Sequence, residues 1–234
     1  MQEGTHQMMG YDRASTMFSP DGRLLQVEYA KEAVRQGSTA IGVVCCDGVI
    51  LITDKRVADN LVVAESIEKI FQVDGHIAAT ATGYVMDGRI LIRRAQVIAQ
   101  QNQVTYNTQI ETSMLVKELS DIKQSFTQYG GARPFGVSIL FAGVDEKPRL
   151  FVTEPTGIFF EYRATAVGEG ADSVKNVLRK DYREDITMDE AIKLSVKALK
   201  KVLGKEFDLK RLDGAYIGLS DKKYKKMDRR KLKG

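Results

Sequence analysis

The stretch SPDGRLLQVEYAKEAVRQGSTAIGV, residues 19–43, decides how this chain folds. It begins with a turn, continues as a helix, and passes through Gly37-Ser38-Thr39 directly into a strand. The Gly37–Ser38 bond can be interpreted in two ways. If the bond is cut, Ser38 becomes a chain terminus with a free hydroxyl nucleophile. If it stays intact, the preceding helix serves another purpose, so the function depends on this choice.

The segments after Gly37 predict two β-hairpins and then two helices. STAIGVVCC and GVILITD are apolar, β-branched runs joined by Asp47-Gly48, and SIEKIFQV and HIAATATG flank Asp74-Gly75. Asp-Gly between such runs is a strong hairpin signal. The pattern then turns helical over 86–103 and over 108–128. In the second helix one face carries Leu115, Leu119, Ile122 and Phe126.

The second half repeats this order of strands and helices. Gly130-Gly131 ends the second helix, and FGVSILFAGVD, RLFVTE and IFFEYRATAV follow as strands. Helices are predicted over 171–182 and 188–203, the latter with Thr187 and Glu190 placed as a capping box. GAYIGLS and the segment around Tyr224 close the chain as strands, and a short helix is expected in the tail.

The order of elements predicts the fold class. Strands joined by hairpins pair antiparallel, and helices that arrive in pairs argue against parallel winding. We therefore expect an α+β protein, a four-layer αββα sandwich of two antiparallel sheets with an extra N-terminal helix. The 234 residues predict one domain. Its expected parts are the helix over about 22–36, the core over 38–220 and a basic C-terminal segment over 221–234.

The net charge of +4 comes from the end of the chain, because residues 222–234 hold eight Lys or Arg against one Asp. The rest of the chain is slightly acidic. A basic tail can bind nucleic acid, but it also keeps a chain end solvated, and no aromatic-rich motif or zinc pattern accompanies it. Nucleic-acid binding is therefore not favoured. Without a long apolar run or a signal peptide, we expect a cytoplasmic protein.

The residues that commonly carry chemistry are few. His6 and His76 are the only histidines, too few for a histidine-based metal site or catalytic triad. Cys45 and Cys46 are adjacent in a predicted strand, which suits neither a disulfide framework nor a zinc site. The stretch over 167–170, VGEG, resembles half of a dinucleotide fingerprint and is interpreted as the start of a helix. No metal or cofactor is expected.

One catalytic set remains as the alternative function. A hydroxyl freed as a chain terminus can use its own α-amine as the base, with a lysine that lowers the barrier and a carboxylate that orients the lysine. Ser38, Lys69 and Asp54 could supply these parts in a self-processing N-terminal nucleophile amidohydrolase. Such a site needs a cut before Ser38.

Several blocks of sequence resemble the α subunits of proteasomes, and the archaeal ones most closely. They are YDR (11–13), FSPDGRL (18–24), QVEYA (26–30), EAV (32–34), SIEKI (66–70), QYGGARPFG (128–136), FAGV (141–144) and RLF (149–151). The resemblance implies two stacked sheets between helix layers, and a non-catalytic subunit. It further implies heptameric rings that cap the catalytic β subunits, whose nucleophile is a processed threonine. Since α subunits stay uncut before the strand, the resemblance implies that no residue here is catalytic.

The resemblance also assigns three functional places. The first is a gate over the axial pore, formed by residues 1–12 and held open by Tyr11, Asp12, Pro20 and Tyr29. The second is a pocket between neighbouring copies that receives the C-terminal tail of an activating AAA ATPase; it includes Gly37, Lys69, Glu28 and Lys31. The third is an annulus around the channel for unfolded polypeptides, formed by Tyr129, Gly130, Gly131 and Ala132.

Overall fold

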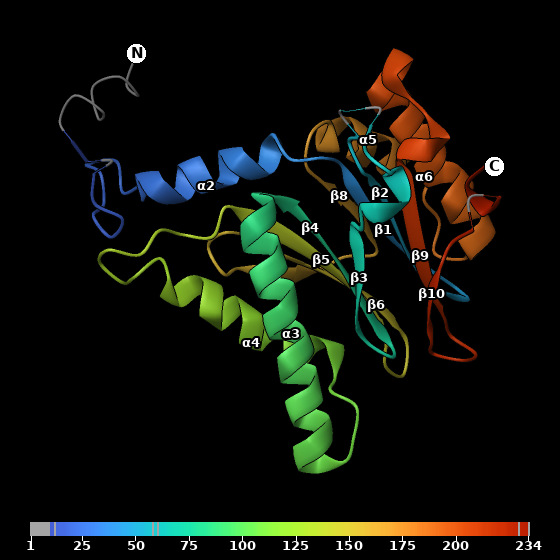
Figure 1. The fold of residues 1–234 in the computed structure, drawn as a ribbon, viewed down its shortest axis with the longest axis horizontal. Helices are drawn as coiled ribbons and strands as arrows, with labels where there is room; N and C mark the ends of the chain where they lie inside the picture. The colour runs from blue at the N-terminus through green and yellow to red at the C-terminus, as the bar shows by residue number, and fades with distance from the viewer. Residues whose placement is uncertain (1–9, 12, 58, 60, 229, 234) are drawn as a thin grey trace.

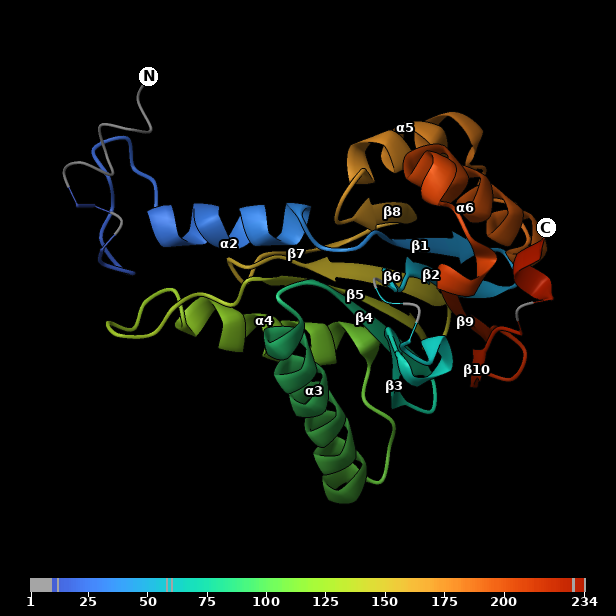
Figure 2. The same cartoon turned by 45° about the horizontal axis from the view of Figure 1, so that its top comes forward.

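The computed structural model describes residues 1–234 except 1–9, 12, 58, 60, 229 and 234. Two five-stranded antiparallel sheets pack face to face, and helices cover both outer faces (Figures 1 and 2). Helix α2 (Leu25–Arg35) precedes the first sheet in the chain. The predicted α+β four-layer sandwich with an extra N-terminal helix is confirmed. No helix among the described residues combines the length and hydropathy needed to span a bilayer.

The first sheet has the strand order β10-β9-β2-β1-β8 and is covered by α5 and α6. Apolar side chains from both fill the space between them. The bounds of these elements are β1 Ala40–Cys45, β2 Gly48–Asp54, β8 Ala164–Val167, α5 Ala171–Asp181, α6 Met188–Leu203, β9 Leu212–Gly218 and β10 Tyr224–Lys226.

The second sheet has the strand order β3-β4-β5-β6-β7 and is covered by α3 and α4. Side chains of β5 contribute alternately to two hydrophobic cores, one under the helices and one between the sheets, because successive side chains of a strand point to opposite faces. Ile139 and Phe141 face the helices, and Leu140 and Ala142 face the first sheet. The bounds are β3 Ile70–Asp74, β4 Ile77–Gly83, α3 Val85–Tyr106, α4 Thr112–Ser125, β5 Val137–Val144, β6 Pro148–Thr153 and β7 Phe159–Glu161.

The run IFFEYRATAV, predicted as one strand, is two strands in different sheets. β7 pairs with β6, with Phe159 opposite Thr153, whereas β8 pairs with β1, with Val167 opposite Ala40. The chain therefore crosses from one sheet to the other at residues 162–163. Apolar and β-branched residues indicate extended backbone but do not show which layer the strand joins.

Three other boundaries differ between the prediction and the structure. Cys45 pairs with Gly48 and Asp74 with Ile77, so the hairpin turns are residues 46–47 and 75–76. Cys46 is therefore an exposed thiol outside the strand, while Cys45 is buried. Helix α4 begins only at Thr112 and ends at Ser125, before the glycine pair.

The basic tail packs on the sandwich. Strand β10 adds to the edge of the first sheet, and a 3₁₀ turn, η4 (Lys231–Lys233), follows it. Met227 and Leu232 are buried in the core between the first sheet and its helices. A final strand and a short helix were predicted here, and both are present.

Candidate functional site

The Gly37–Ser38 peptide lies inside the fold. The N–H of Gly37 donates to Val34 O at 3.0 Å, and its carbonyl accepts from the N–H of Glu169 at 2.8 Å. Ser38 is 7% exposed, and its carbonyl accepts from Thr82 Oγ1 at 3.1 Å. A Cβ at position 37 would lie 2.4 Å from the backbone nitrogen of Gly83. The Gly37 carbonyl and the carbonyl of the next peptide are both hydrogen-bonded and both residues are buried, so this peptide is an integral part of the fold.

Asp54 is held by arginine rather than by lysine. Its side chain is 2% exposed, and Arg211 donates to it through two nitrogens, at 3.0 and 2.8 Å. The backbone N–H of Arg56 adds a third bond at 3.1 Å. A carboxylate with these donors is a strongly held ion pair. Asp54 thus stabilises the fold at this end of the sheet.

Arg56, whose backbone N–H bonds the Asp54 carboxylate, also makes two contacts through its side chain. Its guanidinium donates at 3.0 Å to the carbonyl of Gln36, the C-cap residue of α2, and pairs with the carboxylate of Glu169. Glu169 is also the residue whose backbone N–H donates to the carbonyl of Gly37. One arginine therefore ties the end of α2 to the loop before α5.

Lys69 immediately precedes β3 and is half-buried rather than a fully solvated strand lysine. Burial lowers the pKa of its ammonium, Asp54 raises it and Arg56 lowers it further. Its backbone N–H donates to Asp213 at 3.4 Å, but within the described chain its ammonium has no ion-pair partner. A partly desolvated, unpaired cation is suited to bind a carboxylate from another molecule.

The other two residues of the predicted docking pocket lie on α2. Val27, Ala30 and Val34 bury one side of this helix. Glu28 and Lys31 lie on its more exposed side, 3.3 Å apart. Figure 2 shows α2 reaching away from the sandwich at its N-terminal end. Gly37 and Lys69 share the Arg56 neighbourhood, but no contact joins Glu28 or Lys31 to Lys69 within the described part of this copy.

A tight turn precedes α2 and carries one of the predicted gate residues. The N–H of Gly22 donates to the Ser19 carbonyl at 2.8 Å, and Pro20 occupies the second position, where its fixed φ fits. Gly22 has φ 73°, which favours glycine. Pro20 and Tyr29 are exposed. Tyr11 lies in a turn after Gly10, whereas Asp12 and residues 1–9 lie outside the described residues.

The loop predicted as the annulus lies beside this N-terminal segment. Tyr129 is 65% exposed, and Gly131 has φ 83° with open space around it. Ser15 Oγ donates to the Tyr129 carbonyl at 3.4 Å. A cavity of about 360 Å³ separates residues 13–16 from residues 130–133. The structure thus places the predicted annulus loop beside residues 13–16, which directly follow the predicted gate segment.

Two basic side chains fix the loop on either side. Arg133 donates to both oxygens of the buried Asp87 carboxylate, at 2.6 and 2.7 Å, which holds the C-terminal side of the loop to the start of α3. Lys123, near the end of α4, is fully buried and donates to Val137 O at 3.0 Å and to Thr153 O and Oγ1 at 3.1 and 2.9 Å. The loop between them is short and exposed.

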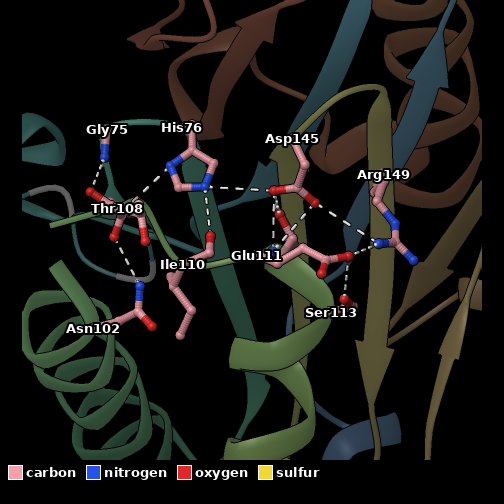
Figure 3. A network of polar contacts seen from close by, with 11 residues as sticks. Gly75, His76, Asn102, Thr108, Ile110, Glu111, Ser113, Asp145 and Arg149 are labelled. Carbon is pink, nitrogen blue, oxygen red and sulfur yellow. Dashed lines mark hydrogen bonds and ion pairs between the residues drawn. The ribbon is translucent and has the colours of Figure 1, made fainter. Parts of the chain in front are cut away.

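His76 is a buried part of a structural network (Figure 3). Its Nε2 lies 2.9 Å from the carbonyl of Ile110 and 3.6 Å from Asp145, while Nδ1 lies 3.5 Å from Asp74. Asp145 also accepts from the backbone and hydroxyl of Thr112, the first residue of α4. The network ties the β3–β4 turn to the start of α4. Among the described residues no cluster of three or more His, Cys, Asp or Glu is placed to hold a metal.

Sequence reasoning missed the cations that close the would-be active site and fix the loop. Arg56 and Arg211 lie in irregular or 3₁₀ segments and follow no periodic pattern. The burial of Lys123 could have been predicted from the sequence. It lies four residues after Leu119, on the apolar face of α4, where a lysine is either buried or bent toward solvent.

Two family models match this chain. The model described as "Proteasome subunit" matches residues 34–217, and a model of the N-terminal signature of A-type proteasome subunits matches residues 11–33. The second covers the turn and most of α2. The two together cover the segment that precedes the strand as well as the sandwich.

Curated relatives agree with these models along nearly the whole chain. A proteasome alpha subunit of Methanosarcina acetivorans is 53% identical over 94% of this chain and 89% of its own length. Proteins of the same name from Methanocaldococcus jannaschii and Archaeoglobus fulgidus are 50% and 49% identical, over 95% and 96% of this chain and 85% and 92% of their own lengths. With α2 retained and the Gly37–Ser38 bond enclosed, this chain belongs to the family of archaeal proteasome α subunits.

Proposed function

We propose that this chain is a non-catalytic subunit that forms seven-membered outer rings of the proteasome in the cytoplasm. The rings control the passage of unfolded polypeptides to β subunits, which carry processed threonine nucleophiles. The observation that carries the proposal is the buried Gly37–Ser38 peptide, whose carbonyl and that of the next peptide are both hydrogen-bonded within the fold. A subunit that keeps α2 cannot expose a terminal hydroxyl, so degradation must be performed by a partner.

The alternative is self-processing before Ser38, with Ser38, Asp54 and Lys69 as the catalytic set. The bidentate Arg211–Asp54 pair disfavours it, because that carboxylate is committed to another cation. Intact mass, native mass and peptide hydrolysis of the purified chain, with and without a β subunit, decide between them. We expect a full-length chain in rings that is inactive until β is added. A chain beginning at Ser38 that hydrolyses amides alone would overturn the proposal.

We assign the docking of an activating AAA ATPase to the half-buried, unpaired ammonium of Lys69, with the backbone of Gly37 beside it. Glu28 and Lys31 of α2 would belong to the same pocket when contributed by a neighbouring copy. Truncating one partner of such a charge pair costs about 2–5 kcal/mol, so Lys69→Ala should weaken binding of the ATPase tail peptide about 30-fold or more. Lys117→Ala, an exposed lysine on α4, is the control. Equal binding by both variants would remove Lys69 from the pocket.

We assign the gate to residues 1–12, supported by Tyr11, Pro20 and Tyr29, and the annulus to residues 129–132. Deleting residues 2–10 should raise hydrolysis of short peptides by the α–β complex without an activator, because the covering segment is gone. The Lys69→Ala substitution combined with this deletion should change nothing further, since no tail has to bind. Unchanged hydrolysis after the deletion, in a complex of normal mass, would refute the gate assignment.

A further inference from the structure

A cavity of about 530 Å³ lies between α2, the ends of β5, β6 and β8, and the first turn of α5. It is lined by neither Gly37 nor Lys69, and Lys31 is the one lining residue that is also assigned to the docking pocket. Its volume falls within the range of small-molecule sites, about 300–1,000 Å³. Its lining is mixed, with hydroxyls, cations and carboxylates.

Two buried hydroxyl side chains line this cavity. Ser138 on β5 is 4% exposed and Thr165 on β8 is 2% exposed. Neither side-chain hydroxyl makes a hydrogen bond in the part of the chain that the structure describes, and neither oxygen is among its fully enclosed unpartnered atoms, so both are reached from the cavity. Buried polar groups in folded proteins are as a rule hydrogen-bonded. These two are therefore available to a molecule inside the cavity.

The start of α5 adds backbone donors to the same space. This helix has eleven residues, begins after Gly170 with φ 69°, and has no side-chain cap. Its first turn, residues 171–173, lines the cavity. The N–H of Ala171 already donates to the Gly168 carbonyl at 3.2 Å, which leaves those of Asp172 and Ser173. With the helix dipole, the free N–H groups of a first turn favour an anion.

Some of the charged side chains in the lining already have an ion-pair partner, and others do not. Lys175 is half-buried and has no ion-pair partner among the described residues, whereas Lys31 and Arg35 each pair at 3.3 Å with a glutamate of α2. The carboxylates of Glu154 and Asp172 also line the cavity. Carboxylates accept hydrogen bonds from hydroxyl groups. The lining suits a molecule with an oxyanion and hydroxyl groups, rather than a bare anion.

We propose that this cavity binds a small phosphate ester that carries hydroxyl groups, such as a sugar phosphate. The phosphoryl group lies at the first turn of α5 and accepts from Lys175, Ser138 or Thr165. The hydroxyl groups donate to Glu154 or Asp172. None of these ligand-binding residues is assigned to the gate or to the docking pocket, which shares only Lys31 with the lining.

Calorimetric titration of the full chain with ribose 5-phosphate, inorganic phosphate and ribose tests the proposal. We expect saturable binding of ribose 5-phosphate, at least tenfold weaker binding of inorganic phosphate, and none of ribose. Equal binding of the two phosphates would overturn the assignment of a phosphate ester. Absence of saturable binding by any probe would overturn the site itself.

Variants locate the binding. Lys175→Gln and Thr165→Val each remove a donor to a charged group and should weaken ribose 5-phosphate binding about tenfold or more. Lys180→Gln, on the same helix but outside the lining, should bind as the parent chain does. Thermal unfolding without ligand identifies any variant that fails to fold; Ser138→Ala then replaces it. Loss of binding in Lys180→Gln, or retention in both cavity variants, would contradict the assignment.

Discussion

At the scale of single residues, Lys123 is the largest fully buried side chain in the described core. Its three acceptors are neutral, two carbonyls and a hydroxyl, and burial lowers the pKa of its ammonium to about 7, against a smaller opposing effect of Glu154. In the unfolded chain the pKa is 10.5. Between these two values the unfolded chain binds a proton that the folded chain does not, so stability rises with pH across that window.

We predict that Lys123→Met removes most of this pH dependence. The free energy of unfolding of the parent chain should gain on the order of 4 kcal/mol from this residue as pH rises from about 7 to about 10. Urea unfolding at both pH values measures the difference between parent and variant. Lys117→Met, exposed on the same helix, should keep the parent's pH dependence. An equal rise in Lys123→Met would show that another group titrates.

At the scale of elements, the capping box of α6 was predicted from the sequence and is present. Thr187 accepts from the N–H of Glu190, and Glu190 accepts from the backbone N–H of Thr187 at 3.0 Å. These bonds to the Thr187 N–H and hydroxyl lower the pKa of Glu190. The stabilisation from the Glu190 carboxylate is therefore fully present above the unfolded pKa of glutamate and is lost as the pH falls through the lower folded pKa, while the bond from the Glu190 N–H to Thr187 stays.

We predict that Thr187→Ala lowers the free energy of unfolding by about 1 kcal/mol at neutral pH, the usual cost of losing an N-cap. Thermal unfolding measures the loss. Thr105→Ala, an exposed threonine near the end of α3, should be neutral or slightly stabilising because alanine is the better helix former. A loss in Thr187→Ala no larger than in this control would show that the cap contributes nothing.

The elements also show where the sequence is informative. Capping residues and Asp-Gly pairs act within a few positions, so α6 and the first hairpins could be placed from local pattern alone. The division of the run over 158–167 into β7 and β8 depends on pairing with β6 and β1, which are distant in the chain. The Arg211–Asp54 pair joins residues 157 positions apart. No local signal predicts either, and both shape the would-be active site.

At the scale of the whole molecule, one exposed face of α3 remains unused by the sandwich. Met86 and Ile90 are 64% and 62% exposed, and with Val97 and the arginines at 89, 93 and 94 they line a groove of about 460 Å³. Figure 1 shows the far end of α3 projecting beyond the sheets. Apolar side chains gathered at such a groove mark an interaction surface. In a chain of this family the partner is another proteasome subunit.

We therefore predict that Ile90→Glu prevents assembly with the β subunit while leaving the chain folded. Burying the new carboxylate in place of an apolar side chain costs several kcal/mol, and Arg93 and Arg94, one helical turn away, offset only part of that cost. Native mass of the mixed subunits measures the assembled fraction, and circular dichroism of the free chain checks the fold. Val104→Glu makes the same change on the same helix outside the groove and should assemble normally. Normal assembly of Ile90→Glu would place the β subunit on a different face.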